Sequence, residues 1–138
     1  MSAPAAYPAP RPTRETAPFW EAAREGRLEL QYCPACARWQ FYPRPFCTTC
    51  LSEALEWRAA SGQGRVHSFT ICHIPAHPAF ADRVPYAMGF IDLDEGVRML
   101  GEVVGGPPRI GAPVKVEFGH RKDGTSLPRW HLDEEGVA

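Results

Sequence analysis

The sequence predicts a mostly β protein with an N-terminal helix, a zinc ribbon and a small five-stranded barrel. Three observations carry this prediction: two Cys-x-x-Cys pairs, a short amphipathic segment before them, and a run of apolar segments separated by Gly and Asp turns after them. A chain of 138 residues suits one domain, or a small domain with a smaller module. We expect a flexible Pro/Ala-rich arm at 1–16, helix and ribbon at 17–53, the barrel at 54–132 and an acidic tail at 133–138.

The helix is expected between Pro18 and Gly26. Thr16 is available near the N-cap, proline suits the first helical turn, and glycine suits the position after the last one. Phe19 and Trp20 lie on the same side of such a helix, which makes it amphipathic. The strand that follows is expected to be half-buried, because apolar and polar residues alternate from Leu28 to Tyr32.

The cysteine spacing is the strongest signal in the sequence. Each Cys-x-x-Cys pair forms a knuckle that points two thiolates at one place, and two knuckles supply a tetrahedral zinc site. The alternatives are two disulfides, an iron site or a chance pattern, but a reducing compartment favours metal. We therefore expect one structural zinc per chain, bound by Cys33, Cys36, Cys47 and Cys50. Four protein ligands leave no open position, so this metal builds structure and does not carry out chemistry.

Aromatic residues fill the segment between the knuckles, and they have two interpretations. They either pack around the metal or form a platform for stacking nucleic-acid bases. Packing is favoured, because only Arg38 and Arg44 accompany the aromatic residues, which are Trp39, Phe41, Tyr42 and Phe46.

Beyond Leu55 the chain is expected to be all-β. Several strands of similar length, joined by Gly/Asp turns, favour a small closed or partly open barrel. The turns are expected at 94–96 and 122–124, and a proline-rich loop precedes the second strand. The five strands are expected at 65–72, 86–93, 97–104, 114–118 and, in a short segment, around Trp130.

Charge and hydropathy restrict the partners. Fifteen basic and sixteen acidic residues give a net charge of −1, and a four-thiolate zinc site adds about −2. No basic stripe of the kind that neutralises phosphates is visible, which argues against nucleic acid. No segment approaches the roughly 20 apolar residues that cross a bilayer, and no secretory signal is evident. We expect a cytoplasmic protein without a membrane partner.

Catalytic candidates are weak. A nucleophile pair of Cys72 and His73 is opposed by strand alternation, which puts the two side chains on opposite faces, and a lone strand cysteine usually packs as a small hydrophobe. A second metal site from His67, His73 and His77 is equally weak, and His120 and His131 have no evident partner in the sequence. No P-loop, nucleophile elbow or dinucleotide fingerprint is present. We expect a binding module with no catalytic residue.

The order of these elements resembles the bacterial and archaeal DUF35 family, over roughly residues 18–132. The likeness is carried by Phe19-Trp20, Gly26-Arg27-Leu28, Tyr42-Pro43-Arg44-Pro45, Ser61-Gly62-Gln63-Gly64-Arg65-Val66, Pro85-Tyr86, Leu93-Asp94-Glu95-Gly96-Val97 and Gly111-Ala112-Pro113-Val114. Ala37 departs from the glycine that zinc knuckles often place there. The resemblance implies a rubredoxin-like zinc ribbon joined to an OB-fold.

The resemblance also implies a role. Members of this family typically accompany thiolase-superfamily enzymes, acyl-CoA hydratases or aldolases as non-catalytic subunits that help shape the acyl-CoA channel. We therefore expect an accessory subunit of a thiolase, an acyltransferase or a steroid side-chain aldolase, with acyl-CoA at the shared interface. The alternatives are a nucleic-acid-binding module and an independent enzyme that uses Cys72 and His73. An accessory role predicts an exposed apolar patch, either on the helix at Phe19 and Trp20 or on the loop holding Pro75, Pro78 and Phe80.

Overall fold

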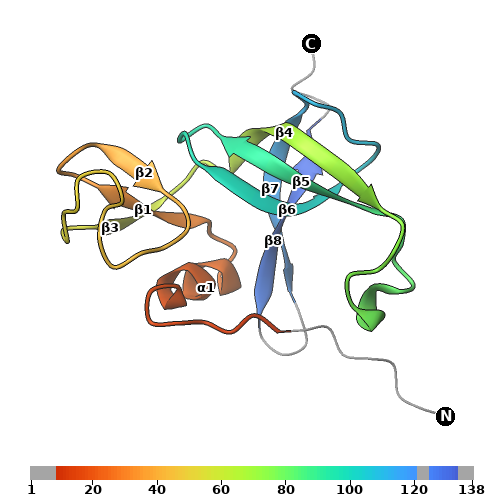
Figure 1. Cartoon of the computed structure of the whole chain (residues 1–138), viewed down its shortest axis with the longest axis horizontal. Helices are drawn as coiled ribbons and strands as arrows, with labels where there is room; N and C mark the ends of the chain where they lie inside the picture. Colours follow the sequence, from red (N-terminus) through yellow and green to blue (C-terminus); the bar gives the residue numbers. More distant parts are fainter. Residues whose placement is uncertain (1–8, 121–124, 134–138) are drawn as a thin grey trace.

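The computed structural model describes residues 9–120 and 125–133. A small three-stranded sheet and a closed five-stranded barrel lie side by side, and helix α1 sits between them at one end (Figure 1). The helix contacts β1 of the small sheet and both β7 and β8 of the barrel. The expected mostly β architecture is confirmed.

Helix α1 (Ala17–Arg24) confirms the expected helix, and the proline and glycine that predicted its ends lie where they were expected. Pro18 lies in the first turn, and Gly26 ends the helix with a φ of +79°. Thr16 occupies the N-cap position, but its hydroxyl accepts a hydrogen bond from the Thr13 N–H instead of capping the helix. Phe19 is buried in the core and Trp20 is half-buried against it.

The small sheet consists of β1 (Glu29–Cys33), β2 (Arg38–Gln40) and β3 (Glu56–Ala59), in the order β2-β1-β3. Both neighbours are antiparallel to β1. Strand β3 follows the second cysteine knuckle and returns to pair with β1, so the sheet of the ribbon continues to Ala59. The boundary expected between residues 53 and 54 therefore precedes a strand that hydrogen-bonds within the ribbon, and not within the barrel.

Two buried glutamines hold the ribbon together. Gln31 and Gln40 are opposite each other on β1 and β2, and Gln40 Nε2 donates to Gln31 Oε1 at 2.8 Å. Gln31 also accepts from the Arg44 N–H and donates to the Arg44 carbonyl, both at 2.8 Å. Gln40 in turn accepts from the Thr48 N–H at 3.1 Å, inside the second knuckle. Gln31 was expected on an exposed face, and it is buried because the backbone at residue 44 satisfies its amide.

The barrel has the strand order β4-β5-β6-β8-β7 and closes between β7 and β4. Its strands are β4 (Gln63–Cys72), β5 (Tyr86–Leu93), β6 (Arg98–Val104), β7 (Pro113–His120) and β8 (Ser126–Leu132), and a single 3-10 turn, η1 (Pro78–Phe80), lies in the loop before β5. All five expected strands are present, and β4, β7 and β8 are longer than expected. The turn expected at 122–124 lies outside the described residues.

The β6–β8 pairing is parallel and short. Only Val103 with Trp130 and Val104 with His131 are paired, whereas the other barrel ladders are antiparallel.

The ribbon and the barrel share one hydrophobic core. Phe19 of α1 and Leu30 of β1 belong to the same buried cluster as Ile91, Met99 and Trp130 of the barrel. At about 25 cal/mol for each Å² of buried apolar surface, such a shared core fixes the two parts against each other. No helix in residues 9–120 and 125–133 is long and apolar enough to cross a membrane.

Replacing Gln31 with leucine should destabilise the protein by about 1–3 kcal/mol, since the amide and carbonyl of residue 44 would be left without their buried partners. Urea unfolding of the zinc-loaded protein measures the loss. Glu29→Leu on the same strand is the matched control, because that side chain is only half-buried. Equal stability of Gln31→Leu and the unmodified protein would contradict the role assigned to the glutamine pair.

Candidate functional site

The four cysteines of the ribbon converge on one point. Their Sγ atoms all lie within 4.8 Å of one another, with 3.5 Å between Cys33 and Cys50 and 3.7 Å between Cys36 and Cys47. Four sulfurs at about 2.3 Å from a central zinc stand about 3.8 Å apart. A disulfide requires about 2.05 Å, so the separations fit a metal and not two bridges. The arrangement fits one structural zinc site.

The two knuckles repeat the same backbone geometry. The residue after each second cysteine has a positive φ, +58° at Ala37 and +66° at Leu51. Its N–H donates to the carbonyl of the first cysteine, at 2.8 Å from Ala37 to Cys33 and 2.9 Å from Leu51 to Cys47. Alanine at position 37 therefore adopts the backbone conformation for which glycine is usually chosen, and it does not disturb the convergence of the sulfurs.

Backbone donors and burial act on the thiols in opposite directions. The N–H groups of Cys50 and Thr49 point at Cys47 Sγ from 3.5 and 3.4 Å, and they lower the pKa of Cys47 to about 6. Burial, together with the neighbouring sulfurs, raises the pKa of Cys36 to about 12. Four thiolates cannot share this space without a cation, and a dication removes that conflict.

The aromatic residues between the knuckles divide into two groups. Trp39 and Phe41 are half-buried and pack against the shared core, as the packing interpretation expected. Tyr42 and Phe46 are exposed. The Arg44 guanidinium lies over the Tyr42 ring, 5.5 Å from its centroid, so this cation is already engaged with an aromatic face.

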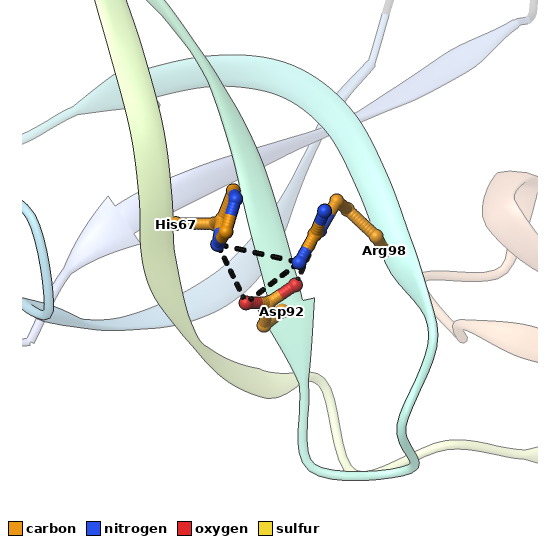
Figure 2. Close-up of polar contacts among 3 residues, drawn as sticks. All are labelled: His67, Asp92 and Arg98. Atoms are coloured by element: carbon orange, nitrogen blue, oxygen red, sulfur yellow. Dashed lines mark hydrogen bonds and ion pairs between the residues drawn. The ribbon is translucent and has the colours of Figure 1, made fainter.

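The histidines do not form a second metal site among the described residues, where the only cluster of ligand atoms is that of the four cysteines. His67 Nδ1 lies 3.1 Å from Asp92 Oδ2 and 3.3 Å from Arg98 Nη2 on the surface of the barrel (Figure 2). His77 Nδ1 accepts from the Ala79 N–H at 3.0 Å and caps η1. His131 Nδ1 lies 2.9 Å from the Leu132 carbonyl, a partner that its sequence position did not suggest.

Cys72 was expected to be a small buried hydrophobe, and it is instead half-buried at the end of β4. In the described part of the chain it makes no hydrogen bond to a histidine, and His73 is exposed to solvent. No general base is therefore placed on the thiol.

A cavity of about 740 Å³ lies where α1, the ribbon and the barrel meet. Its walls come from α1, the ribbon loop at 41–43, the loop around η1, and all five strands of the barrel. This cavity was not expected from the sequence, because its walls come from segments far apart in the chain. Most of the lining is apolar, including Phe19, Trp20, Phe80, Met88, Leu100 and Leu127.

The helix is not the exposed patch that an accessory role predicted, because only 5% of Phe19 is exposed. In the proline-rich loop, Ile74 is exposed and Phe80 is half-buried. A different apolar pair stands out. Phe90 and Leu100 are opposite each other on β5 and β6, and they are 45% and 56% exposed. Leu100 also lines the cavity, so the exposed pair and the cavity are continuous.

The fold and the cysteine cluster define a zinc ribbon joined to an OB-fold barrel. The family model described as the rubredoxin-like zinc ribbon domain of ChsH2 matches residues 20–56, and the model for its C-terminal OB-fold domain matches residues 57–119. The chain belongs to the DUF35 family, as the resemblance in its sequence implied.

Relatives of known description agree with this assignment. A chain of the Ltp2-ChsH2(DUF35) aldolase superimposes with a TM-score of 0.81 and 34% identity, covering 90% of this chain and 98% of that one. A DUF35 domain-containing scaffold protein of Methanothermobacter thermautotrophicus is 32% identical over 62% of this chain and 67% of its own length.

The 3-oxo-4,17-pregnadiene-20-carboxyl-CoA hydratase alpha subunit of Mycobacterium tuberculosis is 34% identical over 95% of this chain. The chain spans 38% and 42% of the length of the two curated relatives named as hydratase alpha subunits.

Replacing Cys33 with serine should abolish stoichiometric zinc binding and unfold the ribbon. In small zinc-binding peptides, structural zinc contributes on the order of 10–16 kcal/mol of apparent binding free energy. That contribution depends on all four thiolates. Elemental analysis should find one zinc per unmodified chain. Cys72→Ser, which changes the cysteine outside the cluster, should retain the metal. Zinc at full affinity in Cys33→Ser, or no metal in the unmodified protein, would contradict the assignment.

Replacing Asp92 with asparagine should destabilise the protein at neutral pH, because it removes the ion pair with Arg98. The loss should be at most about 1 kcal/mol, since both side chains are exposed and solvent screens their charges. Hydrogen bonding from Arg98, with its charge, lowers the pKa of the Asp92 carboxyl. A lowered folded-state pKa gives stability that is complete above the unfolded value and lost as pH falls through the folded one.

The difference between Asp92→Asn and the unmodified protein should therefore begin to shrink as pH falls to the ordinary aspartate pKa. Urea unfolding at pH about 7 and about 4 measures the decrease. Asp94→Asn, in the neighbouring turn, is the control. A difference that is the same at both pH values would show that Asp92 acts through something other than its charge.

Proposed function

We propose that this protein is a non-catalytic accessory subunit that docks on a thiolase-superfamily acyl-CoA enzyme and helps form its acyl-CoA channel. The observation that carries the proposal is the match to a chain of the Ltp2-ChsH2(DUF35) aldolase, of which this chain covers 98%. A benzoylsuccinyl-CoA thiolase subunit of Thauera aromatica is a further relative, at 29% identity. The partner is a thiolase, an acyltransferase or a steroid side-chain aldolase.

The chemistry of this chain supports a subunit that does not catalyse. In its described part, Cys72 has no histidine partner. His77 caps a turn, and His67 joins an exposed ion pair. Thioester chemistry needs an activated nucleophile with a base in reach. The partner supplies those groups.

Within this protein, zinc is held by Cys33, Cys36, Cys47 and Cys50 and has a structural role. It fixes the two knuckles, and through β1 it fixes the ribbon to the shared core. The chain works in the cytoplasm as a helix–ribbon unit, whose sheet extends through β3 to Ala59, and an OB unit that follows it.

The docking surface includes the exposed pair Phe90 and Leu100 on the outer face of β5 and β6. Exposed apolar side chains that adjoin each other on a rigid sheet are typical of a surface that a partner covers. Because Leu100 also borders the cavity, a partner that covers this pair also closes one side of that cavity. A channel shared between the two proteins is the consequence.

Charge distribution favours a protein partner over nucleic acid. Arg27, Arg58, Arg98 and Arg129 are each paired with a carboxylate, so their charges are neutralised within the chain. A phosphate-tracking groove requires cations that are free to neutralise phosphates.

Co-expression with a thiolase-superfamily enzyme of the same genome tests the proposal, followed by affinity purification and an acyl-CoA turnover assay. We expect a stable complex, with turnover that depends on this chain. Phe90→Asp should weaken the complex at least tenfold, because an interfacial aromatic anchor typically contributes more than about 1.4 kcal/mol. Ile110→Asp, at an exposed apolar residue away from the pair, should leave the affinity unchanged.

If no complex forms with any such enzyme, or turnover is the same without this chain, the accessory role is wrong. Sub-micromolar binding of single-stranded RNA or DNA at physiological salt would instead favour the nucleic-acid module.

A further inference from the structure

Strand β4 has a free edge along its second half. It pairs with β5 over residues 64–72, but with β7 only over residues 63–65, and the backbone of Val66 then bonds to the turn at 111–112. Beside residues 67–72, the structure describes no strand on the side away from β5. In an antiparallel ladder every second residue turns its N–H and C=O away from the partner strand. This edge therefore offers backbone donors and acceptors to another strand.

The free edge lacks the charges and prolines that usually keep an exposed strand from pairing with another chain. Residues 66–74 contain no Asp, Glu, Lys, Arg or Pro. A bulge between Val66 and Ser68 lies at the start of the free edge, and beyond it the pairing with β5 is continuous to Cys72. The edge is thus a regular, uncharged strand, of the kind that another strand covers.

Two large apolar side chains accompany the free edge. Phe69 and Ile71 lie opposite Gly89 and Ala87 of β5, so they share the face of the sheet on which Ala87 is buried. Phe69 and Ile71 are nevertheless 37% and 39% exposed. A further strand on this edge would bring its own side chains against both of them.

We propose that the free edge of β4 pairs with the same edge of a second copy of this chain, antiparallel and about a two-fold axis at Thr70. This register places Phe69 of each copy opposite Ile71 of the other, on one face of the joined sheet. It also places the two Thr70 side chains opposite each other on the other face. Aromatic residues opposite β-branched residues, and threonine opposite threonine, both stabilise antiparallel pairs.

The pattern of the strand favours a second copy over another partner. Phe69, Thr70 and Ile71 read apolar, polar, apolar in both directions, so a single register satisfies both copies, as a two-fold interface requires. No like charges meet across the pair, and a formal net charge of −1 on each chain gives little repulsion between copies. Nucleic acid would need cations for its phosphates, and residues 66–74 carry none.

This edge is separate from the docking surface proposed above. Phe90 follows Gly89 in β5, so its side chain points to the opposite face of the sheet from Phe69. Self-association and docking on an enzyme therefore use different surfaces, and the inference does not depend on the proposed function.

Sedimentation equilibrium of the isolated, zinc-loaded chain should show monomers in equilibrium with dimers. Ile71→Lys puts a charge on the edge of both copies and should raise the dimer dissociation constant at least about tenfold. Leu127→Lys is the matched control, because Leu127 is also 39% exposed but lies on β8, which does not pair with β4. That variant should dimerise like the unmodified protein.

The register has its own test, which also decides if Ile71→Lys does not fold. In a Cys72→Ser background, Thr70→Cys places one new thiol on each side of the two-fold axis, close enough for a disulfide. Oxidised glutathione takes up the two electrons and two protons as the bond forms, and a covalent dimer should appear. Leu127→Cys in the same background should give no such dimer, nor should the background alone.

A monomer at about 0.5 mM chain would overturn the inference, since any dimer would then be weaker than a specific interface. Equal dissociation constants for Ile71→Lys and the unmodified protein would do the same, as would equal cross-linking of Thr70→Cys and Leu127→Cys. If the chain is monomeric and Ile71→Lys weakens its complex with a thiolase-superfamily enzyme, the edge belongs to the enzyme and the inference is wrong. The isolated chain decides the other outcomes, so failure here is distinguishable from failure of the docking proposal.

Discussion

The two-pair parallel ladder between β6 and β8 is the constraint on which the rest of the barrel depends. Closure removes the exposed edges of an open sheet, which otherwise pair with other chains. Here it is achieved with few hydrogen bonds, and Trp130, at the end of the ladder, fills the interior beside Gly101. The residues that precede this ladder, 99–102 on β6 and 127–129 on β8, line the cavity, so the site of closure and the cavity are adjacent.

The ribbon is held together by different interactions from those of the barrel. It has too few apolar residues for a core of its own, so the glutamine pair and the converging thiols take that role. Leu30, on the face of β1 opposite Gln31, joins the barrel core. One strand therefore connects a polar network on one face with a hydrophobic cluster on the other, and this fixes the metal centre relative to the barrel.

The sequence predicted features that depend on local spacing, and it missed those that depend on distant partners. The cysteine cluster follows from two repeated spacings, and β5 begins and ends where the apolar segment from Tyr86 to Leu93, before the turn at 94–96, predicted a strand. Gln31 was misplaced because alternation marks a polar side chain as exposed, and only the distant Arg44 backbone explains its burial. The pairing of β3 with β1 and the cavity have the same origin, since residues far apart in the chain form both.

The internal pairing of arginines on the surface has a kinetic consequence. The formal net charge is −1, and neighbouring carboxylates pair with several of the arginines, so the protein projects only a weak long-range field. The paired arginines are Arg27, Arg58, Arg83, Arg98 and Arg129. Encounter with any macromolecule then proceeds without electrostatic steering, at on the order of 10⁵ to 10⁶ M⁻¹s⁻¹, and changes little with ionic strength. A stable complex with such a surface then depends on slow dissociation and not on fast association.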